Sequence, residues 1–440
     1  MRSALPKVLH KLADKSLLEH VYETANSLAP AQLNIVYGHG GETVQDKLTG
    51  FKANWIEQAE QLGTGHAVAQ ALPHIKDDET VLILYGDVPL TQKASLQALL
   101  DQVTATTMGL LTIELPDPTG YGRIVRDSAG AVERIVEHKD ASEAEQLIKE
   151  VNTGMLAVNG KQLRGWLDRL SNDNAQAEYY LTDIIGMAVV DGVEVKTVQA
   201  SNRYEVEGVN DRLQLARLER YYQSMKADEL MTAGVALRDP ARIDIRGELE
   251  CGRDVQIDIN VIIEGKVSLA DNVQIGPNVI LKDCTIGEGT HIEANCVIEQ
   301  AKIGANCNVG PFARLRPGVI LADKAKVGNF VEVKNSTIGE GSKVNHLSYI
   351  GDASLGKDVN IGAGTITCNY DGAYKHQTII GDNAFIGSNS QLVAPVEIGD
   401  NATIGAGSTI SKDVPADGLT LSRSPQKTLK NWQRPTKSKD

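Results

Sequence analysis

The sequence predicts an α/β domain that a helical linker joins to a parallel β-helix. Two observations support this prediction. Up to about residue 210, segments with a helical pattern alternate with short apolar runs of strand length. After residue 250, apolar residues recur every six positions instead. A change of period indicates two domains, and 440 residues exceed what one ordinary core holds. We place the three parts at residues 1–212, 213–233 and 234–440.

The first part opens with an amphipathic helix and continues with apolar strands. Within residues 15–28, one helical face carries four apolar residues: Leu17, Leu18, Val21 and Ala25. Three apolar runs of strand length follow: LNIVYG (33–38), VLILYGD (81–87) and GLLTIEL (109–115). Because helices separate such runs, we expect a parallel sheet that is buried on both faces.

A long helix is expected at about 211–232, and we assign it to the linker. Charged residues cover most of its surface, and Leu213, Leu218 and Tyr221 are expected on its apolar side.

The last part repeats with a period of six. One column consists of valines: Val255, Val261, Val267, Val273 and Val279. A second aliphatic column follows two positions later: Ile257, Ile263, Leu269, Ile275 and Leu281. Aliphatic–glycine pairs then continue the repeat, from Ile303-Gly304 to Ile404-Gly405. This is the hexapeptide pattern of a parallel β-helix, in which each aliphatic side chain points inward and stacks on its equivalent one coil away.

The register of the repeat breaks twice. Residues 346–360 follow a gap of seventeen, and residues 367–378 separate Ile361 from Ile380 by nineteen. Insertions in a solenoid form surface loops that often bind ligands. Both segments are rich in His, Tyr, Asn and Lys, so we expect the chemistry of this part there.

Composition excludes several classes of protein. A net charge of −13 argues against nucleic acid as the main partner. Five cysteines without a C-x-x-C pair indicate free thiols, and Cys284, Cys296 and Cys307 are expected as small core residues. The apolar runs are too short to insert in a membrane, and the first residues lack the apolar stretch of a signal peptide. We therefore expect a cytoplasmic protein.

A candidate cation site follows the run VLILYGD. Its Asp87 lies where a buried strand ends, and ligands of α/β sheets bind beyond the carboxyl ends of strands. Mg²⁺ prefers one or two carboxylates together with substrate phosphates. The alternative is an Asp that caps the following turn. Five further segments carry small or polar residues: 57–68, 117–125, 137–141, 150–154 and 205–211.

Together these segments resemble the sugar-1-phosphate nucleotidyltransferases. Over essentially the whole chain, the sequence resembles the bacterial family of bifunctional N-acetylglucosamine-1-phosphate uridyltransferases/glucosamine-1-phosphate acetyltransferases. The resemblance implies a Rossmann-like nucleotidyltransferase domain and a left-handed β-helix that forms homotrimers. It implies acetyl transfer from acetyl-CoA to glucosamine 1-phosphate. Uridylyl transfer from UTP to N-acetylglucosamine 1-phosphate then gives UDP-N-acetylglucosamine, a precursor of peptidoglycan and lipid A, and pyrophosphate.

The resemblance also implies the residues of the uridyltransferase site. Lys7 would contact the phosphates, and Asp87 and Asn210 would hold Mg²⁺. The uracil site would consist of Gln58, Gly63 and Thr64, with Tyr85 and Gly86 lining the nucleotide. The amino sugar would be held by Gly122, Glu137 and Asn152.

The beginning of the chain, MRSALPKVLH, departs from the family. Family members carry a buried strand and a pattern like L-x-x-G-x-G-T-R-M before the Pro-Lys, and this chain starts at the Met of that pattern. One hypothesis is that the chain as written has little uridyltransferase activity, because one lost preorganised donor costs about 10²–10³ in rate. The other hypothesis is a start assigned too late, which the presence of every downstream site residue favours.

The acetyltransferase site is expected in the β-helix, and the resemblance assigns the role of general base to His346. The alternative is a histidine that only forms structural hydrogen bonds. Imidazole suits proton removal near neutral pH and contributes about 10²–10⁴ in rate. The resemblance assigns the binding of glucosamine 1-phosphate to Arg316, Lys334, Tyr349 and Asn360. It assigns acetyl-CoA to Ala363, Asn369, Tyr370, Ser388, Ala406 and Arg423, with Lys375 as a less specific match near the acyl donor. The alternative for Arg316 and Lys334 is ordinary surface charge. The segment GAGT (362–365) has the alternative of a coil corner that requires glycine, and the basic tail (423–440) that of a solvated chain end.

Two rival interpretations remain. One is a monofunctional sugar-phosphate nucleotidyltransferase with a regulatory β-helix. The other is a non-enzymatic trimeric scaffold. Acetyl-CoA consumption that depends on His346 separates both from the bifunctional enzyme.

Overall fold

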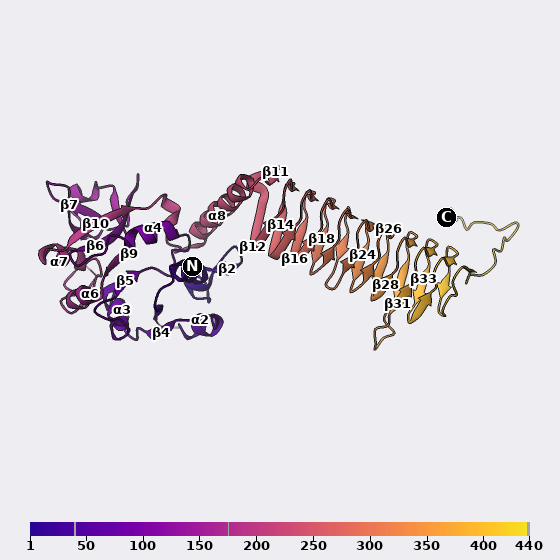
Figure 1. The fold of residues 1–440 in the computed structure, drawn as a ribbon, viewed down its shortest axis with the longest axis horizontal. Helices are drawn as coiled ribbons and strands as arrows, with labels where there is room; N and C mark the ends of the chain where they lie inside the picture. The colour runs from indigo at the N-terminus through magenta and orange to yellow at the C-terminus, as the bar shows by residue number, and fades with distance from the viewer. Residues whose placement is uncertain (39–40, 175, 438–440) are drawn as a thin grey trace. The chain divides into compact units, whose positions relative to one another are not determined.

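The computed structural model describes residues 1–38, 41–174 and 176–437. The chain divides into two compact units, Met1–Tyr222 and Gln223–Asp440. The division lies within the long helix α8 (Arg212–Thr232), in the segment that the sequence assigns to the linker (Figure 1).

A mixed sheet forms the centre of the first unit, in the order β10-β6-β9-β7-β8, with β5 beside β9. Its strands are β5 (Thr80–Ile83), β6 (Thr107–Glu114), β7 (Arg123–Arg126), β8 (Val132–Val136), β9 (Glu150–Asn159) and β10 (Glu194–Gln199). β10 pairs with β6 in parallel, whereas β5, β6 and β7 each pair with β9 antiparallel. The predicted all-parallel sheet is therefore wrong. The polar residues Asn152 and Thr153 interrupt the apolar run of β9, so the sequence pattern did not reveal this central strand.

The first unit contains several helices before α8. They are α1 (Leu17–Asn26), α2 (Glu42–Lys47), α3 (Thr64–Ala71), α4 (Lys93–Leu100), α5 (Glu143–Gln146), α6 (Gly160–Leu167) and α7 (Asp183–Val190). The short elements are η1 (Lys7–Leu9), η2 (Leu72–His74), η3 (Arg203–Glu205), β1 (Lys11–Leu12) and β2 (Lys15–Ser16). α1 confirms the predicted helix: its four apolar positions are buried, and Ser16 and Glu19 form a capping box at its start.

The apolar side of α8 differs from the prediction at one position. Leu218 is fully buried, but Leu213 is 59% exposed. Five residues correspond to well over one helical turn, so Leu213 points away from the face of Leu218. Leu215, three positions before Leu218, is buried in its place.

A cavity of about 770 Å³ is lined by β5 and by β3 (Asn34–Tyr37), which pairs with β4 (Asn54–Glu57) in a separate parallel sheet. Successive residues of both strands, 33–37 and 79–84, line it. Side chains alternate between the two faces of a strand, so a cavity on one face would contact only every second residue. Because this cavity contacts every residue, it runs along the hydrogen-bonding edge of each strand. The prediction of full burial for 81–87 is therefore wrong for β5, whose residues Val81, Leu82 and Ile83 are only half-buried.

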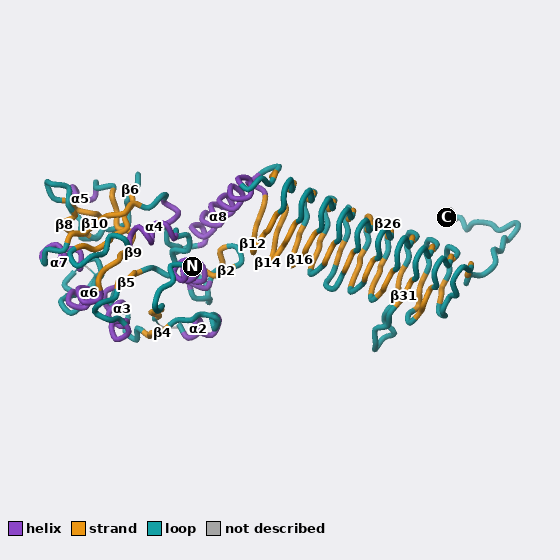
Figure 2. The backbone as a smooth tube through the Cα atoms, viewed as in Figure 1, coloured by secondary structure: helices purple, strands orange, loops and turns teal. Residues whose placement is uncertain are grey.

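The second unit is a parallel β-helix (Figure 2). An 11-stranded sheet contains β11 (Ala236–Leu237), β13 (Gln256–Ile257), β15 (Gln274–Ile275), β17 (His291–Ile292), β20 (Asn308–Val309), β23 (Lys326–Asn329), β26 (Lys343–His346), β29 (Asn360–Ile361), β32 (Phe385–Ile386), β35 (Thr403–Ile404) and β37 (Leu419–Thr420). A 16-stranded sheet contains β12 (Ile243–Cys251), β14 (Val261–Leu269), β16 (Ile280–Ile286), β18 (Val297–Glu299), β19 (Lys302–Ile303), β21 (Arg314–Leu315), β22 (Ile320–Leu321), β24 (Glu332–Lys334), β25 (Thr337–Ile338), β27 (Tyr349–Gly351), β28 (Ala353–Leu355), β30 (Ile366–Cys368), β31 (Thr378–Ile380), β33 (Gln391–Val393), β34 (Val396–Ile398) and β36 (Thr409–Ile410). The short helix η4 (Pro240–Arg242) precedes β12. These almost closed parallel sheets fit the left-handed β-helix that the family resemblance implies.

The core of the β-helix confirms both predicted columns. Every member of the valine column and of the aliphatic column is buried. The predicted core cysteines are buried too, and burial raises the pKa of Cys284 to about 12 and that of Cys296 to about 11. At the corners, residues such as Asn260 and Asn278 take positive φ angles of 59° and 60°, a conformation that Asn adopts more readily than most residues.

The first predicted break in the register is not a loop. Lys343 and Val344 of β26 pair directly with Asn360 and Ile361 of β29, seventeen residues later. The same spacing joins β15 to β17. A gap of seventeen is therefore an ordinary coil whose corner has one residue fewer, and residues 346–360 continue the ladder.

The second predicted break is a loop. β30 ends at Cys368 and β31 begins at Thr378, and an antiparallel bridge between Tyr370 and Lys375 closes the segment between them. Figure 1 shows this loop leaving the coil beside β31.

Candidate active sites

Three residues far apart in the sequence meet at the end of β5. The Lys7 ammonium, on η1, donates to Asp87 Oδ2 at 2.6 Å and to Asn210 Oδ1 at 3.0 Å. Asp87 follows β5, and its backbone carbonyl accepts from Val209 N at 3.0 Å, which fixes the segment before α8 beside it. The structure thus brings together all three residues that the sequence assigns to phosphates and metal.

The chemistry of this cluster fits a divalent cation. Asp87 and Asn210 present a carboxylate and a carboxamide oxygen, and oxygen donors of this kind suit Mg²⁺. Both oxygens already converge on one positive group, the Lys7 ammonium. A cation that binds Asp87 and Asn210 competes with that ammonium, which is then available to phosphates.

The residues assigned to the amino sugar also lie together. Asn152 N, on β9, donates to Gly122 O at 2.9 Å, and Glu137 Oε1 accepts from the Thr182 hydroxyl at 2.9 Å. A Cβ at Gly122 would lie 2.9 Å from Ile135 and 3.5 Å from the Glu137 carboxylate. A side chain there would therefore crowd the approach to Glu137.

Tyr85 lies near the same carboxylate. Burial raises its pKa to about 12, and the negative charges of Glu137 and Asp87 act in the same direction, so its hydroxyl stays protonated. Gly154 has a positive φ of 85°, and a Cβ there would lie 2.4 Å from the Tyr85 ring. At Gly86, a Cβ would lie 3.2 Å from Leu18. The sequence missed Gly154 and Thr182, although Gly154 stands in the segment EVNTG that the motif search selected.

The predicted uracil residues meet at the start of α3. Gln58 Nε2 donates to Gly63 O at 3.1 Å, which leaves the Gln58 carbonyl oxygen as an acceptor. The Thr64 hydroxyl accepts from Leu181 N at 3.1 Å. Gly63 has a φ of 112°, and a Cβ there would lie 2.7 Å from Tyr179 O. The neighbouring backbone therefore leaves no space for a side chain at position 63. The sequence did not reveal this reason for the glycine.

In the second unit, His346 ends β26 and is exposed. Its Nδ1 lies 2.9 Å from Asn329 Oδ1, on the neighbouring strand β23. With the Asn329 carbonyl oxygen as acceptor, the Nδ1 of His346 carries the proton. The Nε2 then holds a free lone pair, as a general base requires. The sequence missed Asn329, because its position beside His346 depends on the seventeen-residue coil.

Three residues assigned to acetyl-CoA, namely Ala363, Ser388 and Ala406, lie at the same corner of the β-helix as His346, each on a later coil. The His346 carbonyl accepts from Gly364 N at 3.2 Å, and that of Ala363 accepts from Asn389 N at 2.7 Å. The Ser388 carbonyl accepts from Gly407 N at 2.8 Å. The Ala406 carbonyl accepts from Arg423 Nη1 at 2.6 Å. His346, Ala363, Ser388 and Ala406 therefore lie on successive coils, and Arg423 is bonded to the last of them.

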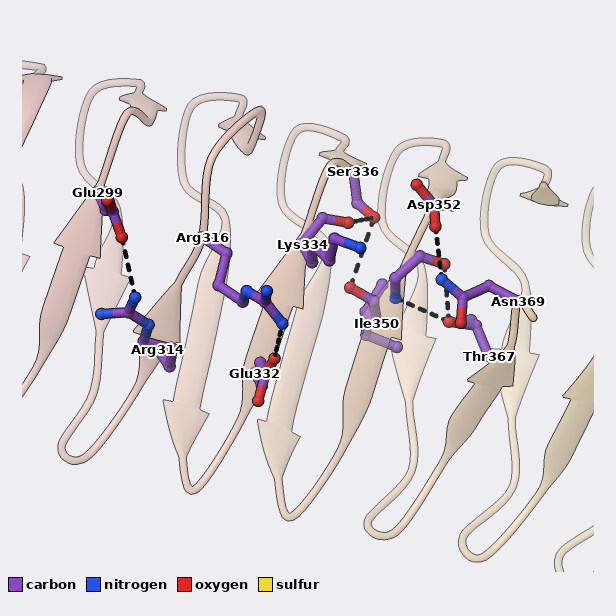
Figure 3. A network of polar contacts seen from close by, with 11 residues as sticks. Glu299, Arg314, Arg316, Glu332, Lys334, Ser336, Ile350, Asp352, Thr367 and Asn369 are labelled. Carbon is purple, nitrogen blue, oxygen red and sulfur yellow. Dashed lines mark hydrogen bonds and ion pairs between the residues drawn. The ribbon is translucent and has the colours of Figure 1, made fainter. Parts of the chain in front are cut away.

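The residues assigned to the sugar phosphate lie on and beside β24, β27 and β29. Arg316 Nη1 donates to Glu332 Oε1 at 2.9 Å, and this bond raises the pKa of Arg316 (Figure 3). Glu332 is paired in register with Tyr349 on β27. Asn360 lies on β29 opposite Lys343. Glu332 was not identified from the sequence, because its partner Arg316 lies one coil away.

The loop between β30 and β31 adds a second cation to Lys334. The positive charge of Lys334 lowers the pKa of Lys375. Two adjacent positive groups suit an anionic ligand. Asn369, at the start of the loop, is buried and donates to Asp352, whereas Tyr370 is 61% exposed and donates to Gly372 O at 2.6 Å.

Comparisons with known proteins match both units. Residues 1–151 match the model of the MobA-like NTP transferase domain, residues 245–329 that of the GMPPB C-terminal domain, and residues 377–412 that of the bacterial transferase hexapeptide. A solved nucleotidyl transferase from Methanothermobacter covers 50% of this chain and 87% of its own, with 17% identity and a TM-score of 0.37, and supports no further argument. None of the helices in the described part of the chain combines the length and apolarity needed to cross a bilayer.

Curated relatives match over the full chain. "Bifunctional protein GlmU" of Methylococcus capsulatus is 60% identical over 100% of this chain and 95% of its own. The proteins of the same name from Stutzerimonas stutzeri and Marinobacter nauticus are 59% and 56% identical, over 99% and 100% of this chain and 96% of their own. The chain therefore belongs to the family of bifunctional GlmU proteins.

Proposed function

We propose that the chain transfers an acetyl group in its second unit and a uridylyl group in its first. The observation that supports acetyl transfer best is the hydrogen bond of His346 Nδ1 to Asn329, which leaves Nε2 as a base on an exposed strand end. The alternative of a monofunctional nucleotidyltransferase is not favoured, because the bifunctional relatives match through both units.

Acetyl transfer begins with glucosamine 1-phosphate and acetyl-CoA. His346 Nε2 takes a proton from the sugar ammonium, and the free amine attacks the thioester carbonyl carbon. The new C–N bond forms as the C–S bond breaks, and the nitrogen releases its excess proton to solvent to give the neutral amide. The departing CoA thiolate takes the proton of the imidazolium. Arg316 and Lys334 bind the sugar phosphate, with Tyr349 and Asn360 completing the sugar site.

The acyl donor lies along the last coils. Ala363, Asn369, Tyr370, Ser388, Ala406 and Arg423 bind acetyl-CoA. The ammonium of Lys375, next to that of Lys334, attracts anionic groups to this end of the site. Exposed aromatic side chains on the coil support a homotrimer with acetyl-CoA sites between subunits. The free cysteines support a cytoplasmic location.

Uridylyl transfer uses the product of the first reaction. A phosphate oxygen of N-acetylglucosamine 1-phosphate attacks the α-phosphorus of UTP, and pyrophosphate leaves. Asp87 and Asn210 hold Mg²⁺, which supplies charge neutralisation at the phosphates when bound. Lys7 contacts the phosphates, Gln58, Gly63 and Thr64 hold uracil, and Tyr85 and Gly86 line the nucleotide. Gly122, Glu137 and Asn152 hold the amino sugar.

The experiment that tests the base is the substitution His346→Ala, with His291→Ala as its control. His291 is also an exposed histidine of the 11-stranded sheet, on β17. We expect His346→Ala to lower kcat of acetyl transfer by about 10²–10⁴, and His291→Ala to leave it unchanged. Acetyl transfer that survives in His346→Ala would contradict the assignment of the base.

A further inference from the structure

A corner beside the proposed acetyl-CoA site carries an acidic side chain without an assigned role. Asp352 lies between β27 and β28 and is half-buried, with a positive φ of 48°. Its Oδ2 accepts a short hydrogen bond from Asn369 Nδ2, and its Oδ1 accepts from Asn335 Nδ2 at 2.6 Å. Figure 3 shows Asp352 and Asn369 directed at each other.

The hydrogen bonds that Asn335 and Asn369 donate to Asp352 fix the orientation of Asn369. An ionised carboxylate only accepts hydrogen bonds, so both neighbouring amides must turn their NH₂ groups toward Asp352. Asn369 then directs its Oδ1 away from Asp352, as an acceptor. The side chain has little freedom to leave this arrangement, because Asn369 is only 8% exposed.

Charges around Asp352 keep its carboxylate ionised. Burial by itself raises the pKa of Asp352, but the hydrogen bonds from Asn335 and Asn369 and the ammonium groups of Lys334 and Lys375 together lower it below its usual value. The backbone holds the residue as well: Asp352 N donates to Lys334 O at 3.0 Å.

We propose that Asp352 is a positioning residue for acetyl transfer. By holding the NH₂ of Asn369, it presents Asn369 Oδ1 to an amide N–H of the pantetheine arm of acetyl-CoA. Asp352 itself touches no substrate. This inference rests on the proposed function, since it takes Asn369 as a residue of the acetyl-CoA site.

The test is the substitution Asp352→Asn in the full chain. Asn has the same shape and tolerates a positive φ, but its NH₂ group faces the NH₂ of either Asn369 or Asn335. One of the two amides must therefore rotate or lose its bond. We expect KM for acetyl-CoA to rise roughly two- to tenfold, as for the loss of one hydrogen bond between neutral groups. We expect kcat and KM for glucosamine 1-phosphate to change much less.

A matched control separates this role from a general effect on the coil. Asp283, on β16, has the same φ of 48°, and its Oδ1 accepts from Lys266 N at 3.0 Å. Asp283→Asn removes an equivalent corner carboxylate from an earlier coil. We expect it to leave KM for acetyl-CoA unchanged. An equal rise of KM in both variants would overturn the proposal.

A double variant tests the direction of the hydrogen bond. In Asp352→Asn with Asn369→Asp, residue 352 donates its NH₂ to residue 369 and accepts from Asn335 through its carbonyl oxygen. Residue 369 again offers an acceptor to the substrate. We expect this double variant to recover most of the acetyl-CoA affinity lost in Asp352→Asn. Failure to recover it, in a protein with unchanged thermal unfolding, would count against the proposal.

The outcomes separate this proposal from the proposed function. If wild-type protein consumes acetyl-CoA and His346→Ala does not, the function stands. An unchanged KM for acetyl-CoA in Asp352→Asn then overturns the positioning role alone. If the wild type consumes no acetyl-CoA, the function itself fails.

Discussion

At the scale of single residues, each site depends on partners that fix a charge or a tautomer. Asn329 directs the proton of His346 to Nδ1, and Glu332 engages Arg316. Lys7 joins Asp87 to Asn210. Motifs revealed His346, Arg316 and Lys7, but not Asn329 or Glu332. The length of each coil decides which residues of neighbouring coils lie side by side, and a short motif does not contain this information.

The substitution Lys7→Met tests the cation site of the first unit, with Lys11→Met as an exposed control. We expect Lys7→Met to lower uridylyl transfer by about 10²–10³, because a positive group at the phosphates is lost. We also expect Mn²⁺ to bind the nucleotide-free variant more tightly than the wild type, because the competing ammonium is gone. Electron paramagnetic resonance measures the bound Mn²⁺. Weaker binding in Lys7→Met would contradict the competition.

The buried cysteines give a prediction about reactivity. Burial raises the pKa of Cys284 to about 12 and that of Cys296 to about 11, so both thiols stay protonated below these pH values. Since the thiolate is the reactive form, we expect neither to react with Ellman's reagent at pH 8 in the folded protein. Both should react in denaturant. Fast reaction of either thiol in the native state would contradict the core position.

At the scale of elements, the two units were predictable to different degrees. A six-residue period determines which side chains face the axis, so both core columns and the β-helix followed from the sequence. The sheet of the first unit was less accessible, because β9 mixes polar and apolar residues and runs opposite to its neighbours. The loop after β30 was predicted from the spacing of the repeat. The segment 346–360 was predicted as a break too, but it is an ordinary coil of seventeen residues.

The cavity along β3 and β5 gives a prediction about local stability. Backbone groups along these edges face the cavity, whereas β6 is paired on both sides, by β10 and β9. We expect amides of β3 and β5 to exchange hydrogen faster than those of β6, as measured by mass spectrometry. Equal protection would contradict an open edge.

At the scale of the whole molecule, the β-helix offers an apolar surface for assembly. Phe312 and Phe330 stack with ring centroids 5.2 Å apart and are 49% and 56% exposed. Leu347, on the following coil, is 63% exposed. An exposed apolar ladder of this kind is typical of an interface between proteins.

The substitution Phe330→Glu tests the proposed trimer. We expect it to shift the mass in analytical ultracentrifugation from three times 47.4 kDa toward a single chain, because a charge cannot be buried in the interface unpaired. We expect acetyl transfer to fall with the trimer and uridylyl transfer to persist. Leu213→Glu, at an exposed leucine of α8, is the control. A trimer that survives Phe330→Glu would contradict this interface.

The central claim is that one chain carries two separate active sites. The most direct test assays acetyl transfer and uridylyl transfer on the same preparations of wild type, His346→Ala and Lys7→Met. We expect the wild type to perform both reactions, His346→Ala to lose only acetyl transfer, and Lys7→Met to lose only uridylyl transfer. A wild type that consumes no acetyl-CoA, or a single variant that loses both reactions while folded, would contradict the claim.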